Sequence, residues 1–171
     1  ALPRELHPVI IGSFFLRAQD KLLLDLRSIE RAVAAIVFFD KHLPRSVTRA
    51  FEAEVVNRLF PLEDARVTPD SIFDRGNSVC MDLEAAMERM KELVAHVEDP
   101  HERLRLAVED MLSRAKQRLP EIERFPIHYY QEGIESFTAS LRMRQIVALQ
   151  HWLGNTEYSL YDVIKAMADA K

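Results

Sequence analysis

The feature that most constrains this chain is a set of dipeptides that end in proline and divide it into segments. In Thr68–Pro69 and Asp99–Pro100, a residue that can cap a helix precedes a proline, which is favoured at the first helical position. Phe125–Pro126 opens a third, largely apolar segment that continues to Leu153. Only 4 of the 171 residues are glycine, and the good helix formers Ala, Leu, Glu, Arg and Met dominate. These signals predict an all-α fold.

The N-terminal part of the chain carries an apolar side chain at every seventh position. The stripe consists of Phe15, Leu22, Ile29 and Ile36, and the positions four residues after these are Gln19, Leu26, Val33 and Asp40. This spacing predicts a heptad-patterned helix that ends at His42–Pro44. An unbroken helix from Val9 to Leu43 would be about 50 Å long, so we expect a break near Gly12 or Asp20. Residues 1–8 are expected to form an irregular arm.

Further helices are expected along the remainder of the chain, over about 46–60, 68–75, 78–98, 99–119, 125–153 and 159–168. Ser46 and Ser78 are the expected N-caps of two of them. Gly154 is the expected C-terminal cap of the 125–153 helix, and Ser159 with Asp162 forms an expected capping box. We therefore predict one domain over residues 1–171, a helical bundle of six to eight helices joined by short loops.

Charge and composition exclude several classes of protein. A net charge of −4 argues against general nucleic-acid binding, which requires a strongly basic surface. No apolar stretch is long enough to span a membrane, and no signal-peptide core precedes Val9, so we expect a cytoplasmic protein. The single cysteine, Cys80, lies in an apolar context and is expected to be a buried structural thiol. Because the chain starts at Ala1 without an initiator Met, we also expect a trimmed tag or a piece of a longer protein.

Several histidines lie one helical turn from an acidic residue, which is the spacing of a metal site built between helices. Glu92 and His96 are four residues apart, as are His128 and Glu132, and His101 closes a Glu-x-x-His spacing that has a proline inside it. These five residues are the candidate metal ligands. The alternative is that they are surface or capping residues, and we predict neither a metal nor another cofactor.

Arg144 and His151, with six residues between them, could carry a different chemistry. This spacing, late in a small helical domain, resembles the motif of HEPN ribonucleases. The resemblance implies that Arg144 holds a scissile phosphate while His151 moves a proton. The alternative is a structural role for Arg144. The helix that carries it is apolar almost all round, so this helix must be buried or lie at an interface. Arg144 then needs a partner, which we expect to be a carboxylate from another helix or a bound anion.

The aromatic residues with polar tips gather in the last third of the chain, where all four tyrosines and the single tryptophan follow residue 128. Such a cluster suits a ligand pocket, a protein interface or the edge of an ordinary core. The candidate ligand-binding residues are Tyr129, Tyr130, Phe137, Arg144 and Trp152.

Three functions remain open from the sequence. We favour a non-enzymatic helical regulatory or protein-interaction module that associates with itself or packs against a protein partner. Its support is the heptad stripe of 15–36 and the dense apolar run of 9–16. The first alternative is a helical sensor domain for a small apolar or aromatic ligand. The second is an enzyme, either a HEPN-like ribonuclease or a metal-dependent helical bundle, with the site around 125–152.

Overall fold

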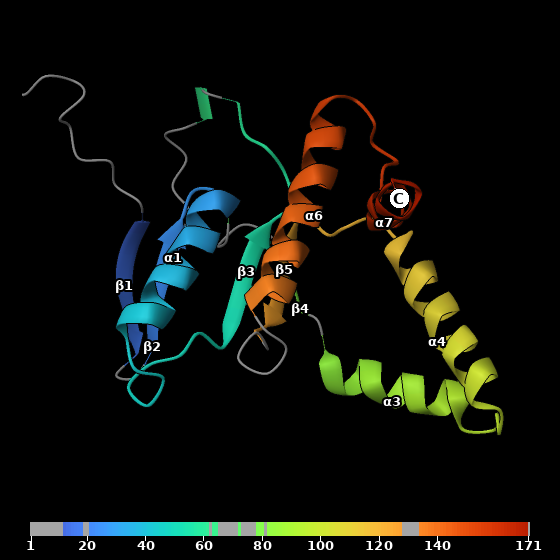
Figure 1. Cartoon of the computed structure of the whole chain (residues 1–171). Helices are drawn as coiled ribbons and strands as arrows, with labels where there is room; N and C mark the ends of the chain where they lie inside the picture. The colour runs from blue at the N-terminus through green and yellow to red at the C-terminus, as the bar shows by residue number, and fades with distance from the viewer. Residues whose placement is uncertain are drawn as a thin grey trace, which may run out of the picture. The chain divides into compact units, whose positions relative to one another are not determined.

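The fold is mixed α/β, as Figure 1 shows for a computed structural model of the chain. The structure describes residues 12–18, 21–61, 63–64, 72, 78–80, 82–127 and 134–170. Within these residues it contains five helices and five strands, the strands forming two sheets. The prediction of an all-α bundle of six to eight helices is therefore wrong. The expected arm of residues 1–8 lies outside the described residues.

The chain divides into two compact units, residues 1–49 and 50–171. Two units of this kind can still belong to one folded domain, so the single domain expected from the sequence stays a prediction. In the described part of the chain no helix has the length and apolar character needed to cross a membrane.

Where the structure describes it, the first unit contains two paired strands followed by a helix. Strands β1 (Gly12–Ala18) and β2 (Lys21–Leu26) are antiparallel, and helix α1 (Ile29–His42) follows. The seven-residue stripe thus runs through strands in its first half and through a helix only in its second half. Aromatic and leucine-rich segments such as 14–16 and 22–24 fit a pleated surface, and pairing two of them satisfies their backbone groups. The predicted end of the helix at His42 is confirmed.

Two local features of this unit involve the close approach of β1 to β2 and the N-terminal cap of α1. A Cβ atom on Gly12 would lie 2.5 Å from the carbonyl oxygen of Asp25, so β1 can approach β2 there only with glycine. At the other end, the Ser28 hydroxyl accepts a hydrogen bond from the backbone N–H of Arg31 and begins α1.

The second unit contains a three-stranded sheet with the order β3-β5-β4. Its strands are β3 (Glu52–Val56), β4 (Ser78–Cys80) and β5 (Ile122–Pro126), with β3 antiparallel and β4 parallel to β5. The predicted helix of 46–60 is therefore wrong, and so is the prediction that Phe125–Pro126 begins a helix. Short apolar segments fit either period, and the central position of β5 between two partners decides for a strand.

The described part of the second unit contains four helices: α3 (Leu83–Val94), α4 (Pro100–Ala115), α6 (Ile134–Trp152) and α7 (Leu160–Asp169). The predicted helix start at Asp99–Pro100 is confirmed, because the Asp99 side chain accepts from the backbone N–H of His101. Ser78 lies in a strand instead of capping a helix, and Asp82 caps α3. The helix predicted after Thr68–Pro69 lies outside the described residues except for Ile72.

The C-terminal caps follow the sequence closely. Gly154 has a positive φ of 98°, as expected for the residue that ends α6. The capping box is confirmed, since the Asp162 carboxylate accepts from the backbone N–H of Ser159 at 2.8 Å. The two bonds that Ser159 donates lower the pKa of Asp162.

The core of the second unit lies between β5 and α6. The rings of Phe125 and Phe137 are 6.0 Å apart between centroids and join the two elements. The buried apolar residues of this unit are Ile122, Phe125, Phe137, Leu141, Val147, Ala148 and Val163. This core holds the residues from which the candidate site is built.

Candidate functional site

A buried ion pair lies at the centre of the second unit. Arg144, on α6, donates from Nε and Nη2 to the two carboxylate oxygens of Glu123 on β5, at 2.8 and 2.9 Å. Asn57, just after β3, donates from Nδ2 to the same carboxylate at 3.2 Å. The guanidinium also lies over the ring of Phe125, 4.9 Å from its centroid. The expected carboxylate partner of Arg144 is confirmed, although it comes from a strand and not from another helix.

The surroundings of Glu123 act on its ionisation in opposite directions. Burial on its own would raise the pKa of this carboxyl. Hydrogen bonds from Arg144, the charge of Arg144 and the hydrogen bond from Asn57 outweigh burial and hold the pKa below the ordinary glutamate value. The pair is therefore ionised at neutral pH, and it links β3, β5 and α6.

The two residues of the ribonuclease-like spacing occupy different surroundings. Arg144 is buried and bound to its carboxylate through two hydrogen bonds. His151, in the last turn of α6, has its Nε2 atom 2.8 Å from the carbonyl oxygen of Tyr158. Because a carbonyl oxygen only accepts, Nε2 carries a proton and donates it. A ribonuclease role for this pair stays a prediction from the sequence.

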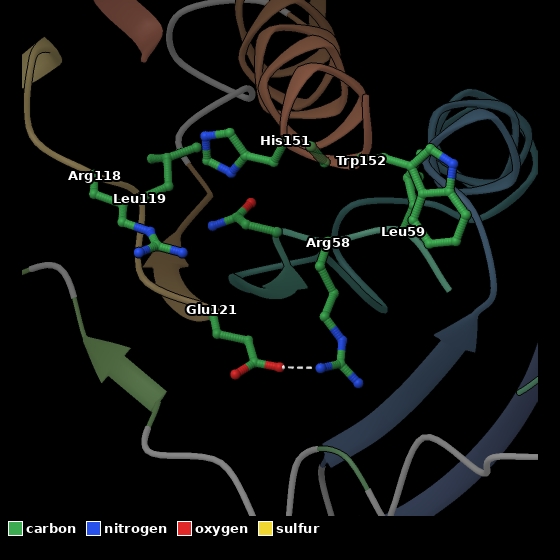
Figure 2. A pocket seen from close by; sticks show the side chains of 9 residues that line it. Arg58, Leu59, Arg118, Leu119, Glu121, His151 and Trp152 are labelled. Atoms are coloured by element: carbon green, nitrogen blue, oxygen red, sulfur yellow. Dashed lines mark ion pairs between the residues drawn. The ribbon is translucent and has the colours of Figure 1, made fainter. Parts of the chain in front are cut away.

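Next to the buried ion pair, the second unit is hollowed by a pocket of about 420 Å³. Figure 2 shows it between the end of β3, the segment before β5 and the last turn of α6. Its lining consists of Asn57, Arg58, Leu59, Arg118, Leu119, Glu121, Ala148, His151 and Trp152. The size lies within the range of sites for small molecules.

The polar groups of the pocket differ in how they are paired. Arg58 and Glu121 form an exposed ion pair at 2.8 Å, marked in Figure 2. Arg118 has no ion-pair partner among the residues that the structure describes. Asn57 Oδ1 is buried and has no hydrogen-bond partner in the described part of the chain. Among the described residues, the pocket thus offers one cationic group without an ion-pair partner and one buried acceptor beside the apolar side chains.

Of the predicted ligand-binding residues that the structure describes, one lies at this pocket. Trp152 lines it, whereas Phe137 and Arg144 lie in the core behind it. Tyr129 and Tyr130 lie outside the described residues. Asn57 and Arg118 were missed, because they are about 60 residues apart in sequence and nothing in the local pattern of either marks a pocket.

The candidate metal ligands are not assembled into a site where the structure describes them. Three of them are exposed: Glu92 lies on α3, His96 follows α3, and His101 lies on α4. His128 and Glu132 lie outside the described residues. Over the described ranges, no three His, Cys, Asp or Glu side chains come together in a way that could hold a metal ion.

Cys80 is exposed, so the prediction of a buried thiol is wrong. It ends β4, a strand at the edge of the sheet with β5 on only one side. The apolar context of the residue in sequence carried no information about this position.

No family model, no curated protein and no solved structure matches this chain. A function must therefore be inferred from the surfaces and pockets of the chain itself.

Proposed function

We propose that this protein is a protein-interaction module that associates with a second copy of itself through one face of α4. The single observation behind this proposal is that α4 buries none of its sixteen residues, although it has an apolar face. A helix in water normally covers such a face against another element. A free apolar face is therefore the surface on which a partner is expected.

The apolar face of α4 is a continuous stripe of three large side chains. Leu104, Val108 and Met111 are spaced four and three residues apart, which places them on one side of the helix. Their side chains are 65%, 40% and 49% exposed. We call these three residues the α4 stripe. Helix α3 packs against α4 and carries two further exposed apolar residues, Met87 and Leu93.

The charges beside the α4 stripe favour a second copy as the partner. Arg105 pairs with Glu102 and Glu109, and Arg114 pairs with Asp110, so both signs alternate along the helix and cancel. A two-fold axis places the same patch on both sides of an interface. A patch with both signs beside an apolar centre can match itself, whereas one with a single sign would repel its copy.

The test is the molar mass of the full chain in solution over a range of concentrations, measured by light scattering or sedimentation. We expect a dimer at high concentration and its loss in Leu104→Glu, which places a charge at the centre of the stripe. Leu153→Glu is the matched control, because Leu153 is the same residue type at the same 65% exposure, just after α6. The control should still dimerise.

Two results would overturn self-association through α4. One is a wild-type chain that stays monomeric at every concentration, and the other is a dimer that Leu104→Glu leaves intact. Loss of the dimer in Leu153→Glu alone would assign the interface to α6. The protein partner and the cytoplasmic location expected from the sequence stay predictions.

A further inference from the structure

The pocket between β3, β5 and α6 has the chemistry of a binding site that is separate from the α4 stripe. We propose that it binds a small aromatic anion: a planar ring that carries a phosphate or a carboxylate group and an N–H or O–H donor. Three features of the lining support this class of ligand. They match its anionic group, its hydrogen-bond donor and its ring, in that order.

The anionic group is matched by Arg118. Glu121 neutralises Arg58 at the rim, which leaves Arg118 as the cation of the lining without a paired carboxylate in the described part of the chain. Its guanidinium extends from the segment before β5 toward the hollow in Figure 2. A guanidinium binds phosphate or carboxylate through two parallel hydrogen bonds.

The donor on the ligand is matched by Asn57. Its side-chain Nδ2 donates to the carbonyl oxygen of Pro120 at 2.9 Å and to the carboxylate of Glu123 at 3.2 Å. Both partners only accept, so the amide cannot be turned around and the unpaired atom must be Oδ1. Asn57 is only 8% exposed, and an unpaired acceptor at that depth is costly. A donor from a ligand in the pocket would satisfy it.

The ring of the ligand is matched by the apolar part of the lining. Trp152 lines the pocket together with Leu59, Leu119 and Ala148. An indole offers a flat face on which a second ring can stack. Asn57 donates to the carboxylate of Glu123, which Arg144 in turn fixes, so Asn57 Oδ1 is already in position before a ligand binds.

The single tryptophan of the chain gives the experiment its signal, because any ligand stacked in the pocket should change the fluorescence of Trp152. The probes are AMP, a ring with a phosphate, and 4-hydroxybenzoate, a ring with a carboxylate. We expect saturable binding of at least one of them, checked by calorimetry, and the two arms distinguish the two kinds of anion. Inorganic phosphate, which lacks the ring, and adenosine, which lacks the anion, should each bind about tenfold more weakly or not at all.

Two variants connect the binding to the lining. Arg118→Gln should raise the dissociation constant of the bound probe by about tenfold or more, since it removes a charge-assisted contact. Arg142→Gln is the matched control, an exposed arginine of α6 that does not line the pocket, and it should bind as the wild type does. In the carboxylate arm, 4-methoxybenzoate should bind more weakly than 4-hydroxybenzoate, because it cannot donate to Asn57 Oδ1.

The proposal is overturned if neither probe binds at millimolar concentration, or if Arg118→Gln binds as tightly as the wild type. Equal binding of inorganic phosphate and AMP would also overturn it, since the site would then hold an anion without a ring. The result is independent of the oligomeric state, because none of the lining residues belongs to α4.

Discussion

Helices α4 and α6 belong to the same unit and have similar lengths, yet they stand in opposite relations to the core. Of the α6 residues whose burial the structure describes, five are buried, from Phe137 to Ala148, and one of them is the charged Arg144. No residue of α4 is buried. The difference does not come from apolar content alone, because α4 carries a complete stripe of large side chains. It comes from the neighbours: α6 has a sheet beside it, whereas α4 contacts the helices α3 and α7 and leaves the α4 stripe exposed.

The same contrast holds for the arginines of the two helices. Arg144 binds its carboxylate away from water, where the attraction between opposite charges is strong. Removing one partner there leaves a buried unpaired charge and strongly lowers stability. Arg105 meets Glu102 and Glu109 in water, where such pairs contribute little. The comparison predicts that equivalent substitutions in the two helices will differ strongly in their effect on stability.

The largest expected effect is that of Arg144→Met. It leaves the buried carboxylate of Glu123 without its cation, and we expect the free energy of unfolding to fall by about 3–5 kcal/mol. Arg105→Met, the matched change on α4, should lower it far less, because the ion pairs of Arg105 are exposed to water. Urea unfolding followed by circular dichroism measures both, and equal losses would contradict the contrast between the helices.

The next effect compares two leucines. Leu141→Ala removes a buried side chain of α6 and should cost about 2–5 kcal/mol. Leu104→Ala, in the exposed α4 stripe, should stay within about 0.5 kcal/mol when measured at a concentration where the chain is monomeric. A large loss for Leu104→Ala under those conditions would show that the stripe packs within its own chain.

The smallest expected effect concerns acid. The pKa of Glu123 is lower in the folded chain than in the unfolded one, so its contribution to stability is present above the ordinary glutamate pKa. That contribution is lost as the pH falls toward the folded value. As the pH falls below the ordinary glutamate pKa, the free energy of unfolding should therefore decrease less steeply in Glu123→Gln than in the wild type. An unchanged slope would mean that the pair does not control the titration.

Helix ends with a chemical marker could be predicted from the sequence. Asp99 before a proline, Gly154 after an apolar helix and Ser159 with Asp162 act through contacts within a few residues, so no distant part of the chain is needed. The sequence also predicted that Arg144 needs a partner, because a charge in an apolar helix must be paired wherever the helix packs.

The strands could not be predicted in the same way. In β3, Val55 lies four residues after Phe51, which fits a helix, while the alternation of Glu52 and Glu54 with apolar residues fits a strand. The ladder between β3 and β5 decides between them, and it joins residues about 70 positions apart. The strand β5 was missed for the same reason, since its proline at position 126 lies at the end of the ladder instead of the start of a helix.

The candidate pocket shows the same limit. Of its lining, only Trp152 was predicted as a ligand-binding residue, because an aromatic cluster is visible in sequence. Asn57 and Arg118 take part because the sheet places the end of β3 beside the segment before β5. By itself, then, the sequence determined the capped helix ends and the demand for a buried ion pair, which depend on local chemistry. Tertiary structure alone decided the strands, the partner of Arg144 and the pocket, because each depends on which distant segments pair in the sheet.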